Sequence, residues 1–330
     1  MESSQSSSFN SKEAYRFIER QCALWDTARY NYEALTQVKT RELEVKGSQV
    51  VLQFNAARIL SSSARVDAAS LRERPCFLCD SNRPSEQMSI SFSEEYEILT
   101  NPYPIFPYHL TIPSKLHQPQ RISRRLGVML QLARQLKRFV IFYNGPHCGA
   151  SAPDHAHFQA GNRGMLPIEK DLFGKEQENF SSEVIRYQSA SLRVYSEYSR
   201  PFFEIRSAEG IEAVYLFSLV YDALEAYSAR NPDLIFTVQE EPMMNLLTWY
   251  EEEEWVVALF PRNRHRPSCY EASGDQNILL SPGAVDMGGF LAIPQKKDFD
   301  KISAEDLEQI FSEVCFDTVQ IEEIVKLINR

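Results

Sequence analysis

An apolar stripe over residues 126–140, framed by strand-like segments on both sides, limits the folds that are open to this chain. The stripe has helical spacing and predicts an amphipathic helix, with Ser123 as a candidate N-cap. The flanking segments are β-branched or alternating and predict strands at 96–100, 109–112, 139–143 and 155–160. The central part of the chain therefore combines a sheet with a covering helix.

Similar patterns extend toward both ends. We expect one helix over 11–37 and a hairpin of 42–46 and 49–54 around Gly47. The stretch 56–87 is rich in Ser, Arg, Asp and Pro and offers little to a core, so another interaction must order it. In the second half we predict strands at 192–197 and 202–207 and a helix at 210–227.

The two halves also share a weak sequence echo. Ile112-Pro113 and the helix after it are echoed by Ile293-Pro294 and a later helix, which suggests an internal duplication. The second half holds a single histidine, His265. Histidine chemistry is therefore expected in the first half alone.

Composition excludes several classes of protein. A net charge of −10 disfavours nucleic acid and anionic membrane as partners. The polar, serine-rich start does not resemble a signal peptide, and no apolar run is long enough to span a bilayer, so a cytoplasmic location is expected. Six cysteines without a secretion signal fit a reducing compartment, where paired cysteines suggest a metal site.

The segment 144–159 carries the main chemical signal. If His155, His157 and Gln159 lie on one strand, their side chains share a face at a spacing of about 6.5–7 Å. A neutral imidazole can attack phosphorus where nearby donors, such as those of Gly149 and Ser151, hold the phosphate oxygens. Gln159 can bond a phosphoryl oxygen but cannot protonate a leaving group, which favours transfer over hydrolysis. The alternative is a pair of structural histidines on a half-buried strand.

These residues, in the order Gly-x-Ser-x-Pro and then His-x-His-x-Gln, resemble the transferase branch of the histidine-triad superfamily. That branch includes galactose-1-phosphate uridylyltransferase, diadenosine tetraphosphate phosphorylase and the GDP-hexose phosphorylases. The similarity to GDP-L-galactose and GDP-D-glucose phosphorylases extends over about 53–170. It rests on the blocks Gln53-Phe54-Asn55, Asn101-x-x-Pro104-Ile105-x-x-x-His109, Pro119-Gln120-Arg121-Ile122 and Pro167-Ile168-Glu169-Lys170.

The resemblance implies a role for individual residues. His157 would be the nucleophile that forms a nucleotidyl-histidine, and Gln159 would contact the transferred phosphoryl group. The residues that would bind phosphate are Asn144, Gly149, Ser151 and Arg58. A separate basic cluster of Arg121, Arg124 and Arg125 is compatible with an anionic substrate, and for Arg124 and Arg125 the alternative is a solvated helix face.

A metal site is implied by the same resemblance. Cys76 and Cys79, with His117 and His155, occur in the order of the zinc ligands of the uridylyltransferases. A structural zinc ion would also order the stretch around Cys76. The alternative is two buried thiols and a surface histidine, because the GDP-hexose phosphorylases do not share the Cys-x-x-Cys pair.

Together these features predict an α+β fold of the histidine-triad type, with two antiparallel half-barrel units and flanking helices. We place an N-terminal helix and strand at 1–50, a catalytic unit at 51–190 and a degenerate second unit at 191–330. The expected activity is a nucleotidyltransferase of the phosphorylase type, with a nucleotide sugar, preferably GDP-hexose, and inorganic phosphate as substrates. Alternatives are a diadenosine polyphosphate phosphorylase, a uridylyltransferase-like enzyme, or a nucleotide-binding protein without turnover. A homodimer is compatible with the resemblance.

Overall fold

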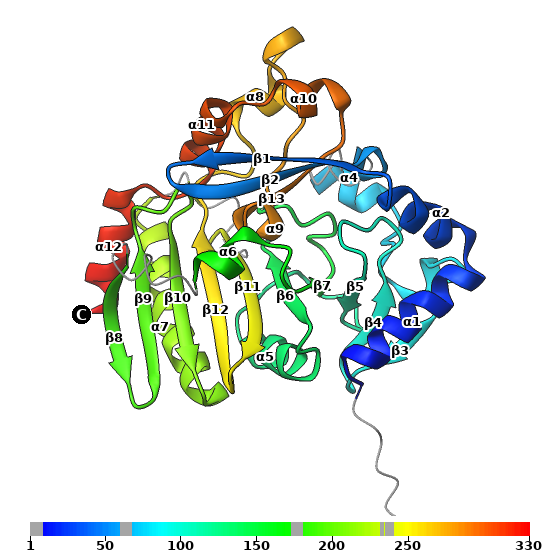
Figure 1. Cartoon of the computed structure of the whole chain (residues 1–330). Coiled ribbons are helices and arrows are strands. Elements are labelled where there is room, and N and C mark those ends of the chain that lie inside the picture. The colour runs from blue at the N-terminus through cyan, green and yellow to red at the C-terminus, as the bar shows by residue number, and fades with distance from the viewer. Residues whose placement is uncertain (1–8, 60–67, 173–180, 232–233, 235–240) are drawn as a thin grey trace, which may run out of the picture.

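The architecture is centred on one ten-stranded antiparallel sheet (Figure 1). The computed structural model describes residues 9–59, 68–172, 181–231, 234 and 241–330. In sheet order the strands are β3 (Ser89–Ser91), β4 (Glu97–Thr100), β5 (His109–Pro113), β7 (His157–Asn162), β6 (Phe139–Asn144), β11 (Met244–Glu251), β12 (Glu254–Pro261), β10 (Phe202–Ser207), β9 (Ala190–Tyr195) and β8 (Ser182–Tyr187).

This sheet consists of two halves with the same topology. One half has the order β3-β4-β5-β7-β6 and the other β8-β9-β10-β12-β11, and they meet where β6 pairs with β11. Each half has one connecting helix: α5 (Leu126–Gln135) leads from β5 to β6, and α7 (Gly210–Ser228) leads from β10 to β11. The α+β fold with duplicated antiparallel sheets is therefore confirmed.

The sequence echo, however, is in the wrong register. Ile293 ends β13 (Phe290–Ile293), which pairs with β2 (Ser48–Phe54) in a separate sheet, so it has no equivalence to Ile112 in β5. A stretch of only a few shared residues does not specify which strands of the two halves correspond. The domain boundaries after residues 50 and 190 stay predictions; the first falls within β2.

The second sheet has three strands, in the order β1 (Lys39–Val45), β2 and β13. β1 and β2 form the predicted hairpin, whose turn is made by Lys46 and Gly47 at φ 47° and 73°. Figure 1 shows this small sheet lying across the upper end of the large one, with α10 (Lys296–Lys301) and α11 (Ala304–Val314) beyond it.

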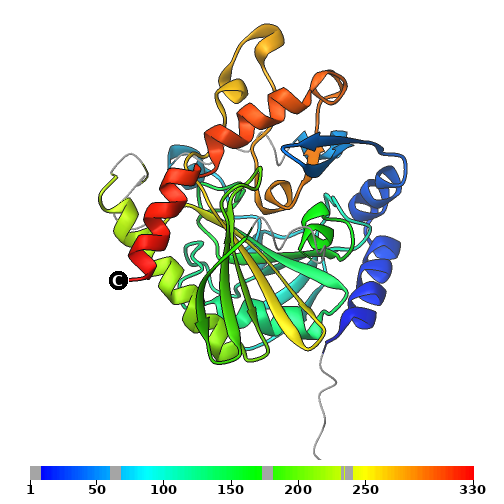
Figure 2. The ribbon, with the colours of Figure 1, turned by 60° about the vertical axis from the view of Figure 1, so that its left-hand side comes forward.

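Each face of the large sheet has its own apolar core. On one face β-strand side chains pack against α5 and α7, and further against α1 (Ser11–Leu24) and α12 (Thr318–Ile328). On the other they pack against the small sheet, α11 and two short helices, α6 (Pro167–Asp171) and α9 (Ala284–Met287). Figure 2 shows α7 and α12 side by side at one flank. Within the part of the chain that the structure describes, no helix has the length and apolarity to cross a membrane.

Three local expectations differ from the structure. The helix expected over 11–37 is two helices, because Trp25 is extended at φ −129° and ψ 107° between α1 and α2 (Asp26–Leu35). α5 begins after Arg125 rather than after Ser123. β7 begins at His157, so His155 lies in the turn before it, where its N–H donates to the carbonyl of Ala152 at 3.2 Å.

Candidate active site

A cavity of 610 Å³ opens between the large sheet and the small one. Its walls include side chains of β5, β6 and β7 on one side, and of α9 and β13 on the other. All six residues that the sequence predicted for catalysis and phosphate binding line it: Arg58, Asn144, Gly149, Ser151, His157 and Gln159. Segments far apart in the chain are thus brought to one cavity.

His157 occupies the first position of β7 and is 5% exposed. Its Nδ1 lies 2.8 Å from the carbonyl oxygen of His155. Since a carbonyl only accepts, Nδ1 carries the ring proton and Nε2 keeps its lone pair. Burial lowers the pKa of His157 to about 4, so the ring is neutral at physiological pH. A neutral imidazole with a bare Nε2 in a cavity is a competent nucleophile.

The backbone of His157 is held by a residue that sequence analysis noted only within a motif, Gln120. Its amide oxygen accepts from the N–H of His157 at 2.8 Å, and its Nε2 donates to the carbonyl of His157 at 3.0 Å. The same Nε2 donates to the carbonyl of Asn144 at 2.9 Å. Gln120, which is buried, therefore ties the start of β7 to the end of β6.

The amide of Gln159 has a defined orientation. His109 accepts the N–H of Ile105 at Nδ1 (3.2 Å), so its Nε2 carries the proton and donates to Oε1 of Gln159 at 3.1 Å. Burial lowers the pKa of His109 to about 3, which keeps this pattern of donor and acceptor. Because Oε1 is engaged, the Gln159 NH₂ group, which has no partner among the described residues, is left to donate in the cavity.

A loop ahead of β7 supplies further donors. Gly149 has φ +90°, and a Cβ there would lie 2.7 Å from Cα of Gly283, so only glycine fits. Within the described residues, no group accepts from the N–H groups of 149–151, and these residues line the cavity. Consecutive backbone N–H groups of this kind suit an anion. Nearby, Oδ1 of Asn144 accepts from the N–H of Ala284 at 2.7 Å, which leaves its NH₂ group as a donor.

The second half of the chain contributes to the same cavity, contrary to the expectation that the first half carries the whole site. The contributing residues include His265, Arg266, Ser281, Gly283 and Asp286. Their loops are held by Arg262, a fully buried side chain whose guanidinium donates to the carbonyls of Val314 and Pro282 at 3.0 and 2.9 Å. No local pattern in the sequence marks these loops as part of a site.

The predicted arginines differ in their position. Arg58 lines the cavity and donates to the carbonyl of Tyr103 at 2.9 Å. Burial lowers its pKa to about 10, partly offset by Asp286, so the group stays charged. Arg121, Arg124 and Arg125 are not among the cavity-lining residues, and all three precede α5, so they lie on no helix face; Nη1 of Arg125 donates to the carbonyls of Pro119 and Arg121 at 3.1 and 2.9 Å.

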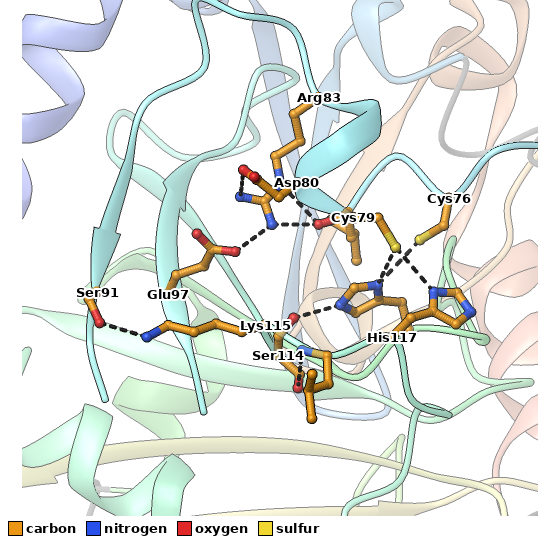
Figure 3. A network of polar contacts seen from close by, with 12 residues as sticks. Cys76, Cys79, Asp80, Arg83, Ser91, Glu97, Ser114, Lys115 and His117 are labelled. Carbon is orange, nitrogen blue, oxygen red and sulfur yellow. Dashed lines mark hydrogen bonds and ion pairs between the residues drawn. The ribbon is translucent and has the colours of Figure 1, made fainter. Parts of the chain in front are cut away.

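The four predicted metal ligands form one cluster beside the cavity. The ligand atoms of Cys76, Cys79, His117 and His155 all lie within 4.8 Å of one another. Figure 3 shows both cysteines pointing toward imidazole nitrogens, with Sγ of Cys79 3.3 Å from Nδ1 of His117. Nδ1 of His155 lies 3.3 Å from Sγ of Cys76. Two thiols and two imidazoles are a donor set that structural zinc sites use, so these four side chains could hold a metal ion.

Groups around the cluster orient its imidazoles as metal ligands require. Nε2 of His155 lies 2.7 Å from the carbonyl of Ser114, so that Nε2 carries the proton and Nδ1 is free to ligate. Nε2 of His117 lies 3.7 Å from a carboxylate oxygen of Asp154. Arg83 donates twice to the carbonyl of Leu78 and pairs with Glu97, which supports the loop between the cysteines (Figure 3).

Comparisons with known proteins give a partial match to a family and a similar fold. Residues 17–162 match a family described as a domain of unknown function, DUF4922. No protein of curated function matches the chain by sequence. The structure is similar to yeast Ap4A phosphorylase Apa2 in complex with AMP, with a TM-score of 0.59 and 14% identity over 91% of this chain and 96% of the other.

Two further structures are similar to the chain. One is the same yeast enzyme in complex with Ap4A, with a TM-score of 0.57 and 15% identity over 89% of this chain and 97% of that one. The other is a GalT-like protein from Arabidopsis thaliana, with a TM-score of 0.35 and 15% identity over 85% and 100%. The likeness to the yeast enzyme extends over nearly all of both chains and confirms the histidine-triad-like fold.

Proposed function

We propose that the protein transfers a nucleotidyl group from a nucleoside di- or polyphosphate to an acceptor, through a covalent intermediate on His157. One observation carries this proposal: a buried neutral imidazole has its Nδ1 proton on the His155 carbonyl and its bare Nε2 in a 610 Å³ cavity lined by anion-binding donors. The fold shared with an Ap4A phosphorylase supports the same conclusion.

The chemistry has two balanced steps. Nε2 of His157 attacks the phosphorus next to the nucleoside, a P–N bond forms, and the bond to the leaving phosphate oxygen breaks. An oxygen of inorganic phosphate then attacks the same phosphorus, the P–N bond breaks, and a nucleoside diphosphate leaves. Gln159, the 149–151 loop and Asn144 donate to the phosphoryl oxygens, while the charge of Arg58 offsets theirs.

Two donors fit this chemistry and differ only in the leaving group. A GDP-hexose would release a sugar 1-phosphate, and this assignment rests on the sequence resemblance. A dinucleoside polyphosphate would release a nucleoside polyphosphate. The fold shared with a phosphorylase solved in complex with Ap4A supports this donor as well as the sequence resemblance supports GDP-hexose. The cavity holds polar groups from both halves of the chain, which supports a donor with a long, doubly substituted phosphate chain.

We also propose that the Cys76, Cys79, His117 and His155 cluster holds a zinc ion. The ion would supply the cross-link that orders the loop around Cys76. His155 would then hold the ion through Nδ1 while its carbonyl fixes the tautomer of His157.

The test is direct detection of the intermediate. The protein is incubated with α-³²P-labelled nucleotides, in a panel that includes GDP-sugars, UDP-glucose and Ap4A, and is quenched in alkali. We expect a protein-bound label that is stable in alkali, lost in acid and discharged by phosphate. His157→Asn keeps a donor toward the His155 carbonyl but has no nucleophile, so it should fold and carry no label. If no nucleotide in the panel labels the wild type, the proposed transfer is refuted and the alternative of a nucleotide-binding protein without turnover is favoured.

A further inference from the structure

We propose that Arg74 is a positioning residue for nucleotidyl transfer, which fixes the 149–151 loop against the cysteine loop and places positive charge beside the phosphoryl site. This inference rests on the proposed function. Arg74 follows α4 (Ala68–Glu73) and precedes the first cysteine of the cluster by two residues. Neither the motifs nor the resemblance assigns it a role.

The contacts of Arg74 join three parts of the site. Its Nη2 donates to the carbonyl oxygen of Ser151 at 2.6 Å. The same nitrogen lies 3.8 Å from Oδ1 of Asp154. Its guanidinium carbon lies 5.5 Å from the ring centre of Phe77, the residue after Cys76. A single side chain therefore connects the anion-binding loop, the carboxylate beside His117 and the loop between the cysteines.

The bond to Ser151 matters because of its direction. A backbone carbonyl carries a partial negative charge, and Ser151 belongs to the loop 149–151, which lines the cavity and whose N–H groups have no acceptor among the described residues. The guanidinium engages this carbonyl and so fixes the peptide between Ser151 and Ala152. Without Arg74 the peptide can rotate, and a partial negative charge is left unpaired near an anionic phosphoryl group. Misplacement of this loop would slow the chemical step more than it weakens binding.

Arg74 is also placed to act through its charge. It lines the cavity, and its side chain is 27% exposed. Its Nε is buried and has no hydrogen-bond partner among the described residues. In a chain of net charge −10, a guanidinium at the cavity wall raises the local potential felt by a polyphosphate.

Asp154 extends the connection to the metal cluster. Its carboxylate lies 3.8 Å from Arg74 and 3.7 Å from Nε2 of His117. His155, the next residue, offers its Nδ1 to the cluster and its carbonyl to His157. The cluster is thus joined to both reacting elements, to His157 directly and to the 149–151 loop through Arg74.

The experiment compares Arg74→Gln and Arg74→Lys with Arg72→Ala, which removes an exposed arginine two residues away. We expect the labelling rate constant and kcat to fall about 10- to 100-fold in Arg74→Gln, while KM for the nucleotide changes less than about threefold. Arg74→Lys, which keeps the charge and one donor, should recover a large part of the loss. Arg72→Ala should label like the wild type.

A merely structural role would give a different result. It would lower the melting temperature or the labelled fraction of Arg74→Gln while leaving the rate constant of the labelled fraction unchanged, and this outcome would overturn the inference. So would equal rate constants in Arg74→Gln and the wild type. A wild type that takes no label would instead refute the proposed function itself. If Arg74→Gln does not fold, Arg74→Lys alone carries the test: its labelling rate constant should stay below that of the wild type while KM for the nucleotide changes less than about threefold, and a fully wild-type rate constant with a raised KM would overturn the inference.

Discussion

Gln159 shows how one residue can depend on another far along the chain. Its Oε1 accepts from His109 at 3.1 Å, so the direction of its NH₂ group is set by a histidine on β5. Gln159→Glu keeps the shape and the acceptor toward His109 but replaces the donor with a charged oxygen. We expect kcat for nucleotidyl transfer to fall about 100-fold or more, because a donor to the phosphoryl group becomes a repelling charge.

The control for this prediction is the same substitution elsewhere in the cavity. Gln87 also lines it, and its Nε2 donates to the carbonyl of Thr100 at 3.2 Å. Gln87→Glu adds one negative charge to the cavity without touching the donors around His157, so its loss should be much smaller. Steady-state kinetics with the best nucleotide of the panel measure both. Equal losses would show that net charge, and not the Gln159 donor, is responsible.

At the residue scale, sequence reasoning succeeded where side chains alternate along one strand. His157 and Gln159 are two apart on β7 and both line the cavity. His155 was wrongly placed on the same strand, because the start of β7 is fixed by contacts outside the segment, such as the bond of Ala156 N–H to the Gln118 carbonyl at 2.6 Å. Gln120 was missed as a positioning residue because a lone glutamine carries no recognisable signature.

At the scale of elements, the 149–151 loop depends on a close approach between two segments. Gly149→Ala would place a Cβ 2.7 Å from Cα of Gly283 and strain a backbone at φ +90°. We expect a destabilisation of about 2–4 kcal/mol and a large loss of labelling. Gly164→Ala is the matched control, since φ is +81° but nothing lies within 4 Å of its Cβ. It should cost about 1–2 kcal/mol from backbone strain and leave labelling unchanged. Urea unfolding and labelling on each variant separate the two effects.

A buried acid links two other elements of the first half. Glu241 accepts the N–H of Ile122, ahead of α5, at 2.8 Å, and the hydroxyl of Tyr143 on β6. Burial raises the pKa of Glu241 to about 7 from an ordinary value of 4.5. The unfolded chain therefore releases this proton at lower pH than the folded one. The stabilisation is complete below about pH 4.5 and is lost as the pH rises through 7.

The direction of this pH dependence can be tested by a substitution at Glu241. Glu241→Gln keeps the acceptor for Ile122 and removes the ionisation, so its stability relative to the wild type should improve between pH 5 and 8, by an amount on the order of 3 kcal/mol. Urea unfolding at several pH values measures the difference. A constant difference between the two proteins across this range would contradict the expected titration of Glu241.

Elements were predictable where the local sequence determines them. The β1–β2 hairpin followed from Gly47 and its flanking β-branched residues, and α7 from its apolar pattern. The start of α5 could not be predicted in this way, because no side chain caps the helix at Arg125 and the local sequence therefore does not mark its first residue. The break at Trp25 was likewise invisible, since that residue has an extended backbone but no helix-breaking side chain.

At the scale of the whole molecule, the cavity lies where the two sheets and loops from both halves meet. The six first-half residues predicted for catalysis and phosphate binding belong to or follow short motifs, whereas other first-half residues of the wall, such as Arg74 and Gln87, carry no such signal. The wall formed by Ser281, Gly283 and Asp286 was not predictable either, because these residues reach the site only through tertiary contacts such as that of Ala284 N–H with Asn144. The duplicated topology was expected, but its register was fixed by sheet pairing rather than by the short echo.

The cysteine–histidine cluster is a candidate for the interaction that was expected to order the stretch around Cys76. It brings Cys76 and Cys79 together with His117 and His155, so a bound ion would cross-link three distant parts of the chain. We expect about one zinc ion per chain by metal analysis. Its removal by a chelator should lower the free energy of unfolding by about 4 kcal/mol if the free ion is otherwise held near 1,000 times its Kd.

Cys79→Ser should reproduce the effect of the chelator, with loss of the ion and faster amide hydrogen exchange in the loop around Cys76. Cys269→Ser is the matched control, because Cys269 is a partly buried free thiol outside the cluster. It should keep the ion and the wild-type stability. Since the carbonyl of His155 fixes the tautomer of His157, the metal-free protein should also label more slowly. A metal-free preparation with full stability and unchanged exchange in that loop would show that the four side chains hold the fold together without an ion.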